Sequence, residues 1–296
     1  MNWQERMEAA IGYLERNLEG KPEWGRAAAE ANCSAFHFLR MFEVVTGTTA
    51  GEYIRRRRLS LAAQRLSTGD HRVIDIALAF GYESADAFAK AFKREFGVNP
   101  SEAKEKGVVL RVWPRLSFSV VLKGDIPMEY RIETRDALKM TGLALAVSPE
   151  GGENFISIPA FWQRTIAEGN CGKLEAAMPP DTRLGVMGVC ANDYSEKTKT
   201  FTYLIAIEQP ADKAARAKLP AGCIDIEAPA GTWAVFGARG PLPVSIQAVW
   251  KRIYGEWFPA SGYEHAGTPE LEVYSEGDPQ APDYYSEVWV PIRKVG

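Results

Sequence analysis

One short segment near the carboxy terminus places an acid and two aromatic side chains on the same side of an expected strand. In YYSEVWVPI the side chains alternate, so Tyr285, Glu287 and Trp289 should share one face and the aliphatic residues the other. A carboxylate withdrawn from water between aromatic rings suits an organic cation, through charge pairing and cation–π attraction. The alternative is an exposed edge strand with a solvated glutamate.

A second chemical feature is a run of four guanidinium groups, Arg55 to Arg58. On a helix, such a run is either a solvated face or a clamp for DNA phosphates. Its place between two candidate DNA-recognition helices favours the clamp. We therefore expect Arg55 and Arg56 to contact DNA.

The sequence offers little for catalysis or metal binding. It has three histidines and four widely spaced cysteines with no CxxC pair, so we expect reduced, mostly buried thiols and no metal site. It also has no evident Ser/His/Asp or Cys/His set and no glycine-rich loop for phosphate. We expect no catalytic residues and no cofactor.

Length and charge bound the organisation. A chain of 296 residues with 46% hydrophobic content favours two packed domains. Residues 1–107 hold 16 Lys and Arg against 15 Asp and Glu, so DNA affinity must come from locally clustered cations. The start lacks the pattern of a signal peptide and no apolar run is long enough for a bilayer, so we expect a cytoplasmic protein without a membrane partner.

The amino-terminal region contains two helix-turn-helix patterns, from Trp24 to Gly47 and from Val73 to Gly97. In each, a short helix and a turn precede a longer amphipathic helix, which is the unit that inserts into the major groove. Ser34 and Ser84 are good N-caps for the two longer helices. A helix over residues 50–66, capped by Thr49, should join the two units.

These residues resemble the AraC/XylS family of regulators in the strings SAFHFLRMFEVVTG, EYIRRRRLSLAAQRL and IDIALAFGYESADAFAKAFKREFGVNPSE. The resemblance covers about residues 5–106 and implies a seven-helix module that binds DNA through both recognition helices. Carried over by position, the implied DNA contacts of the first helix are Phe36, Leu39 and Arg40. Those of the second helix are Ala85, Asp86, Ala87, Ala89 and Lys90.

The two recognition helices differ in the chemistry they offer to DNA. Arg40 has the donor fork that pairs with guanine, worth about 1–3 kcal/mol of discrimination. The second helix presents mainly alanines and the acid Asp86, which repels phosphate. We therefore expect sequence discrimination to come mostly from the first helix, while the second positions the DNA backbone.

The carboxy-terminal region shows an internal duplication. Residues 108–126 are expected to form a linker and a first strand, and a strand–helix–strand–strand pattern then occurs twice. The first copy has residues 130–133 and 138–147 as one extended segment, a helix at 155–168, and strands at 183–190 and 201–208. The second has strands at 223–228 and 231–239, a helix at 242–258, and strands at 270–274 and 284–292.

This layout, with FWQRTIAEG, VWKRIYGEWFP and the ending ELEVY…SEVWVPI, resembles the GyrI-like effector-binding domain. The resemblance implies a sheet with a cleft that binds hydrophobic, often cationic, aromatic compounds through a central glutamate. Glu287 matches that glutamate best, with Glu272 in reserve. The candidate aromatic walls are Tyr203, Trp250, Tyr274 and Trp289. Trp162 and Trp257 are either further walls or helix-packing core.

We therefore expect an all-α tandem helix-turn-helix domain (1–107), a linker and strand (108–126), and an α+β domain with a duplicated β-α-β-β layout (127–296). The order is similar to that of Rob-type regulators. It implies a ligand-responsive transcription regulator whose partners are double-stranded DNA, a small-molecule effector and RNA polymerase, acting as a monomer or dimer. The alternatives are a small-molecule hydrolase, with Glu287 as general base and Tyr203 as its partner, and a protein-inhibitor module.

Overall fold

The computed structural model describes residues 3–20, 22–68, 71–105, 108–117, 127–149, 153–182 and 184–294. The chain forms two compact units. The first comprises residues 1–38 and 48–120, and the second comprises residues 39–47 and 121–296. The boundary therefore passes through one helix, whose first turn belongs to the first unit and whose remainder belongs to the second.

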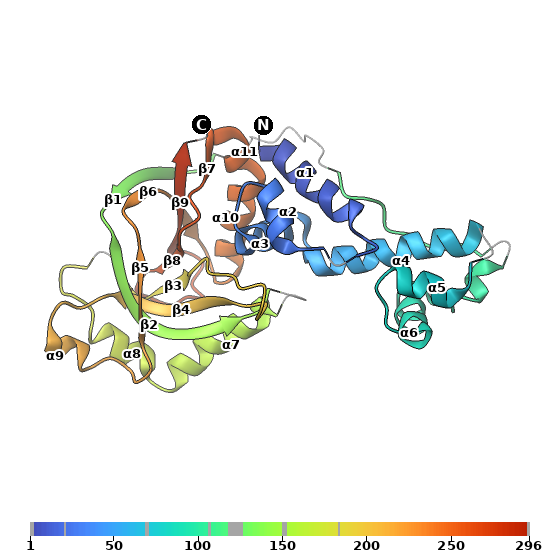
Figure 1. Ribbon diagram of the computed structural model, residues 1–296. Coiled ribbons are helices and arrows are strands. Elements are labelled where there is room, and N and C mark those ends of the chain that lie inside the picture. Colours follow the sequence, from blue (N-terminus) through green and yellow to red (C-terminus); the bar gives the residue numbers. More distant parts are fainter. Residues whose placement is uncertain are drawn as a thin grey trace. The chain divides into compact units, whose positions relative to one another are not determined.

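The first unit is helical (Figure 1). Its elements are α1 (Trp3–Arg16), α2 (Trp24–Glu30), the start of α3 (Ala35–Thr46), α4 (Ala50–Thr68), α5 (Val73–Ala79), α6 (Ala85–Phe96) and a short 3₁₀ turn (Glu102–Lys104). This confirms both helix-turn-helix patterns.

The expected helix caps are present. The backbone N–H of His37 donates to Ser34 Oγ (3.2 Å), that of Glu52 to Thr49 Oγ1 (3.1 Å), and that of Ala87 to Ser84 Oγ (3.1 Å). Each side chain satisfies an N–H group that the helix itself leaves without a partner. Gly47 and Gly97 follow α3 and α6 with φ near +70° and +79°, a conformation that glycine adopts without strain.

The second helix-turn-helix unit has its own apolar core. Phe88 and Phe92 of α6 are fully buried and pack with Phe80, which lies just after α5. Leu59 and Leu66 of α4 close the cluster. The predicted buried face of α6 is therefore confirmed, and its outer face is left for other contacts.

The strand expected within 108–126 does not form in residues 108–117, and residues 118–126 lie outside the described part of the chain. Trp113 binds the first unit instead. Its backbone N–H donates to Ser60 Oγ (2.8 Å) and its Nε1 to Glu95 Oε1 (2.6 Å). These two hydrogen bonds hold the segment against α4 and α6, and it does not join a sheet.

The second unit is built on a nine-stranded antiparallel sheet with the order β1-β6-β9-β8-β3-β4-β2-β5, and β7 pairs with β9. The strands are β1 (Tyr130–Arg135), β2 (Leu138–Val147), β3 (Met187–Cys190), β4 (Phe201–Glu208), β5 (Ile224–Ala228), β6 (Gly231–Arg239), β7 (Tyr263–His265), β8 (Glu270–Tyr274) and β9 (Tyr285–Lys294). The second half of this order repeats the first half in mirror image: β8, β9, β6 and β1 correspond to β3, β4, β2 and β5. This symmetry confirms the duplication. The single extended segment expected at 130–147 is wrong, because β1 and β2 pair in opposite halves of the sheet.

Helices cross over between the strands of each copy. They are α7 (Asn154–Ala167), α8 (Asn170–Glu175), α9 (Lys213–Arg216), α10 (Val244–Arg252), a π-helical turn (Ile253–Trp257) and α11 (Phe258–Ser261). The helix expected at 242–258 is therefore present as one continuous helical run over 244–261, which contains a π-helical turn.

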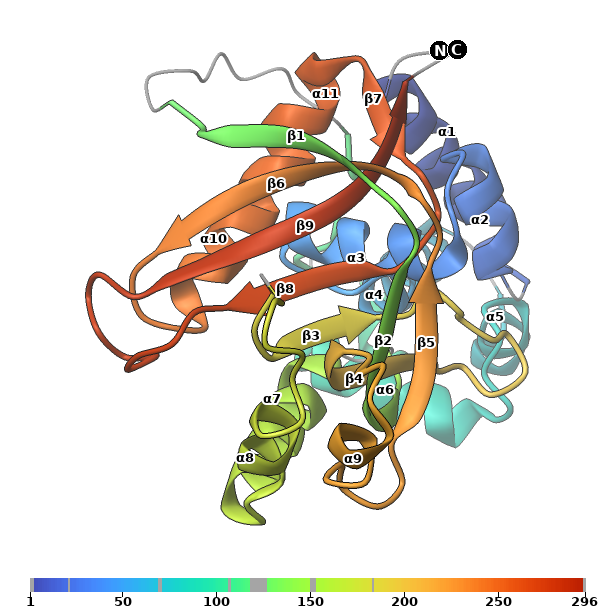
Figure 2. The ribbon, with the colours of Figure 1, turned by 90° about the vertical axis from the view of Figure 1, so that its left-hand side faces the viewer.

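The sheet is curved (Figure 2), and its two faces carry different side chains. One face carries its own apolar cluster, which includes Trp233, Leu271 and Trp289. The other carries Glu272, Val288 and Val290, as alternation along β8 and β9 requires. The helices α7 and α10 pack on this second face, where their tryptophans meet side chains of β4 and β8.

Candidate functional site

Glu272 lies at the centre of a group of aromatic side chains on the helix-covered face. Its Oε1 accepts a hydrogen bond from Trp250 Nε1 (2.7 Å), and its Oε2 accepts one from Tyr274 Oη (2.8 Å). The rings of Trp162 and Tyr274 meet edge-on, with 5.2 Å between their centroids, and Trp162 Nε1 donates a hydrogen bond to Tyr203 Oη (2.9 Å). The structure thus brings together Glu272 and three of the four expected aromatic walls.

A glycine makes this arrangement fit. A Cβ atom at Gly188 of β3 would lie 2.2 Å from Tyr203 Oη, which is far inside any real contact. The absence of a side chain at Gly188 lets the tyrosine extend across the sheet towards α7. Sequence analysis missed this residue, although a glycine between the buried Met187 and Val189 is the kind of signal that marks a close approach.

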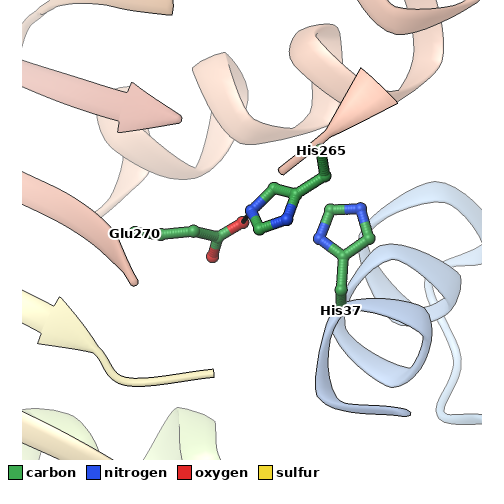
Figure 3. A group of neighbouring side chains, drawn as sticks. All are labelled: His37, His265 and Glu270. Atoms are coloured by element: carbon green, nitrogen blue, oxygen red, sulfur yellow. Dashed lines mark ion pairs between the residues drawn. The ribbon is translucent and has the colours of Figure 1, made fainter. Parts of the chain in front are cut away.

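Glu270 is a second carboxylate of the site that sequence analysis also missed. It is 2% exposed and accepts a hydrogen bond from Tyr254 Oη (2.8 Å). His265 Nε2 lies 3.1 Å from Glu270 Oε1 (Figure 3). His265 Nδ1 accepts a hydrogen bond from the backbone N–H of Gly267, and Nε2 is the ring nitrogen that faces the carboxylate. The spacing in ELEVY already places Glu270 and Glu272 on one face.

We refer to these side chains together as the acidic aromatic cluster. Its members are Glu270, Glu272, Trp162, Trp250, Tyr203, Tyr254 and Tyr274.

The cluster holds a cation from its own chain, Arg40 of α3. Nη1 of Arg40 lies 2.5 Å from Glu270 Oε2, and Nη2 lies 3.4 Å from Glu272 Oε1. The guanidinium carbon lies 3.8 Å from the centroid of the Trp250 ring. Burial by itself would lower the pKa of Arg40, but the charge of Glu270 raises it above its usual range. The side chain therefore stays charged, and it neutralises one of the two carboxylates.

The tyrosines of the cluster and the neighbouring thiol of Cys190 do not provide a nucleophile. Burial raises the pKa of Tyr203, Tyr254 and Tyr274 well above the usual value. Burial also raises the pKa of the Cys190 thiol, which accepts from Arg40 Nη1 at 3.3 Å, to about 12. At neutral pH these groups keep their protons, and the hydroxyls of Tyr254 and Tyr274 donate hydrogen bonds to Glu270 and Glu272.

Glu287, the preferred effector glutamate, lies on the opposite face of the sheet. It pairs with Val273, so its side chain points away from Glu272. Arg131 of β1 binds both of its oxygens at 2.7 and 3.0 Å. Burial would raise the pKa of Glu287, but hydrogen bonds from Arg131, Tyr285 and Trp289 lower it. The expected anion among aromatic rings is present, but its cation is built into the sheet.

This placement corrects two further expectations. Trp289 belongs to the apolar cluster of that opposite face and is no wall of the Glu272 site. Glu287 and Tyr203 project from opposite faces, since Tyr203 pairs with Cys190, and Cys190 with Glu270. They therefore cannot act as a general base and its partner. Of the two undecided tryptophans, Trp162 borders the site, whereas Trp257 packs in the core.

The first recognition helix does not present the expected DNA-contacting face. Leu39 is buried at 6% exposure, and the side chain of Arg40 is 15% exposed within the acidic aromatic cluster. The prediction that both lie on the open surface of the helix is wrong in this conformation. The cause is the cluster, because two carboxylates and an indole face attract a guanidinium. The side chain of Phe36 lies outside the described part.

The arginine run is also engaged internally. Arg55 binds Glu52 and Glu95, and Arg56 binds Glu52, all at 2.7 Å. Arg57 binds Glu15 at 2.8 Å, and Arg58 donates to the backbone carbonyl of Leu18 at 2.7 Å. The run is therefore neither a solvated face nor a free phosphate clamp. It ties α4 to its neighbours, and Arg55 and Arg56 keep only a partly exposed edge.

The second recognition helix presents its outer face. Asp86 and Lys90 form an ion pair of 2.8 Å with side chains 77% and 78% exposed. Lys93 and Arg94 are exposed on the following turn, and Ala85 is half-buried. Of the two recognition helices, α6 is the one whose expected contacts are accessible in this structure.

Comparison with known proteins assigns the second unit. Residues 128–293 match the family described as a GyrI-like small molecule binding domain. The chain belongs to the GyrI-like family. Residues 27–106 match a helix-turn-helix domain, so the AraC-type module precedes the GyrI-like domain in the expected Rob-type order. The chain is thus a DNA-binding transcription regulator of the AraC type with a ligand-binding domain.

Curated relatives match the helix-turn-helix part. The regulatory protein SoxS of Salmonella typhimurium is 35% identical over 106 residues, which are 36% of this chain and 99% of SoxS. The HTH-type transcriptional activator AarP of Providencia stuartii is 39% identical over 89 residues, or 30% of this chain and 66% of AarP. The right origin-binding protein of Escherichia coli is also 39% identical over 89 residues, which are 31% of its length.

Solved structures are similar to the GyrI-like part. A putative bacterial transcription regulation protein from Staphylococcus aureus has a TM-score of 0.47 and 22% identity, covering 56% of this chain and 99% of that one. SAV2435, solved with tetraphenylphosphonium bound, has a TM-score of 0.48 and 23% identity, covering 56% and 94%. Among the described residues, no helix is both long enough and apolar enough to cross a membrane.

Proposed function

We propose that the GyrI-like domain of this regulator binds a hydrophobic cation at the acidic aromatic cluster, with Glu272 and Glu270 as its anionic partners. The observation that carries the proposal is the guanidinium of Arg40, which lies against the Trp250 ring between the two carboxylates. A site that already surrounds one organic cation has the charge and the ring faces to bind another.

The chemistry of the cluster favours a cation over a neutral aromatic ligand. Two carboxyl groups, those of Glu270 and Glu272, face the single guanidinium of Arg40. Removing charges from water is costly unless they are paired, so a second or replacement cation is the ligand that this site stabilises most. Trp162, Trp250 and Tyr274 supply the apolar contacts.

The effector site is tested by titrating the full chain with tetraphenylphosphonium and following tryptophan fluorescence. Tetraphenylborate has the same shape and the opposite charge, and we expect it not to bind. Glu272→Gln should weaken the cation about tenfold, the scale of one charged contact. Glu287→Gln is the matched control, because that glutamate lies on the opposite face and is bound by Arg131. Equal losses in both variants, or equal binding of the anion, would refute the proposed site.

The DNA-binding part completes the proposal. Effector binding would alter transcription through the helix-turn-helix module, with double-stranded DNA and RNA polymerase as macromolecular partners, in the cytoplasm. SoxS and AarP are named as a regulatory protein and a transcriptional activator, which supports contact with the transcription machinery. We propose no catalytic step, because the phenols of the cluster and the neighbouring thiol of Cys190 keep their protons at neutral pH.

A further inference from the structure

Arg40 belongs both to a DNA recognition helix and to the candidate effector site. We infer that Arg40 is an internal ligand of the acidic aromatic cluster, and that a cationic effector binds by replacing its guanidinium and so frees α3 for DNA. The inference rests on the proposed function and adds its regulation. A single side chain would then couple the two activities of the protein.

The contacts of Arg40 are those expected of a bound ligand. Its guanidinium makes charge-assisted contacts with Glu270 and Glu272 and a face contact with Trp250, and a donor of the same group reaches Cys190. These are the groups that would meet an aromatic cation. Two cations cannot occupy the same ring face, so effector and Arg40 must exclude each other there.

Replacement of Arg40 by another cation is electrically balanced. If Arg40 left alone, the buried carboxylate of Glu270 would lose the guanidinium that lies 2.5 Å from its Oε2. An entering cation restores the charge pairing in the same step. A neutral molecule or an anion does not restore this pairing. We therefore expect only cations to replace the guanidinium of Arg40.

The corresponding arginine on the other face shows what a purely structural pair looks like. Arg131 lies in β1, whose pairing with β6 and onward to β9 fixes it beside Glu287 and Trp289. Its backbone cannot move away from Glu287 without loss of the strand pairing between β1 and β6. Arg40 lies on a segment 230 residues away in sequence from Glu270, and no strand pairing holds it there.

The consequence for DNA binding follows from linkage. While Arg40 occupies the cluster, its donor fork is unavailable to a base and Leu39 is buried. A cation that binds only when Arg40 has left must therefore favour the DNA-competent conformation. By reciprocity, DNA bound through α3 must raise the affinity for the cation by the same factor.

The test compares cation affinity and DNA affinity in the full chain. Tetraphenylphosphonium is titrated into the wild-type protein, Arg40→Ala and Arg40→Lys. DNA affinity is measured with a duplex enriched from a random pool by the wild-type protein in the presence of that cation. We expect Arg40→Ala to bind the cation roughly tenfold more tightly, because the internal competitor is gone, and Arg40→Lys to fall in between. Lys90→Ala, a matched cation on α6, should leave cation affinity unchanged.

The wild-type protein supplies a readout that needs no variant. When the cation is added, hydrogen exchange of the α3 amides at residues 41–46 should become faster, while the exchange rate of the α6 amides stays the same. The affinity for DNA should rise roughly tenfold, the same factor as that expected for cation binding in Arg40→Ala. Suppose that binding of the cation depends on Glu272, but Arg40→Ala leaves the affinity for the cation unchanged and the cation leaves the affinity for DNA unchanged. That result would overturn the inference. Binding that ignores Glu272 would instead overturn the proposed effector site itself.

Discussion

The two recognition helices of this protein have the same local structure and opposite environments. Both α3 and α6 have 12 residues, begin at a serine cap and end at a glycine in the left-handed region. The outer face of α6 carries exposed Asp86 and Lys90. The equivalent region of α3 has Leu39 buried and Arg40 bound to two glutamates.

This difference separates folding information from regulatory information. Caps and apolar periodicity are sufficient to make each helix, and they act within a few residues. What each helix does with its outer face depends on side chains elsewhere in the chain. In α6 the face is a set of solvated charges, whereas in α3 it completes a charged site of the GyrI-like domain.

The largest effect expected from this comparison is on stability. Arg40→Met should lower the free energy of unfolding of the second unit by about 3–5 kcal/mol, because it removes the guanidinium that pairs with the buried carboxylate of Glu270. Lys90→Met in α6 should change stability by no more than about 0.5 kcal/mol, because both members of its ion pair are exposed. The measurement is urea unfolding of the full chain, followed by tryptophan fluorescence.

A second variant tells an unpaired charge apart from lost packing. If the penalty comes from the charge of Glu270, the double variant Arg40→Met/Glu270→Gln should recover most of the lost stability. Equal losses in the single and double variants would mean that Arg40 acts mainly through its packing on Trp250. Equal losses in Arg40→Met and Lys90→Met would remove the contrast between the helices.

The elements and their caps could be predicted from the sequence because their causes are local. Ser34, Ser84 and Gly47 act on neighbouring backbone groups, and alternation in YYSEVWVPI assigned the faces of β9 correctly. Alternation also implies that Glu270 and Glu272 share a face. It does not say which face of the sheet the helices cover, and the match to the family's glutamate favours Glu287 over Glu272.

The missing part of the site depended on contacts between distant parts of the chain. The arginine that pairs with Glu287 comes from β1, and its position follows from strand order, which the repeat alone did not determine. The contact of Arg40 with Glu270 spans 230 residues. No local pattern in either segment carries that information, and family resemblance assigned Arg40 only to DNA.

A smaller effect concerns Glu43, one turn after Arg40 on α3. Burial raises the pKa of Glu43 to about 7, and the residue lines a hollow with Gln247 and Lys251. Its pKa in the unfolded chain is near 4.5, so the folded state holds the proton more strongly. This contribution to stability is complete below about pH 4.5 and is lost as the pH rises through about 7.

Glu43→Gln should therefore stabilise the protein by about 1 kcal/mol at pH 8 and by nearly nothing at pH 4, a figure reduced for the partial exposure of the side chain. Urea unfolding across this pH range measures the difference. Lys90→Met on α6 alters no carboxyl group and serves as the control. Its effect on the free energy of unfolding should not change between pH 4 and pH 8 in the way expected for Glu43→Gln. A pH-independent effect of Glu43→Gln would mean that the carboxyl group ionises normally.

The smallest effect is expected on the exposed helix and concerns the type of DNA contact. Lys90→Ala should weaken binding about equally for all duplex sequences and reduce the slope of log affinity against log salt by about 1, as the loss of one phosphate contact requires. Asp86→Asn should strengthen binding slightly, since it releases Lys90 from its ion pair and removes a charge that repels phosphate. Arg40→Ala, compared in the presence of tetraphenylphosphonium, should instead relax the preference for guanine. If Lys90→Ala relaxes base preference more than Arg40→Ala does, α6 discriminates sequence, and the burial of Arg40 would then control affinity without controlling specificity.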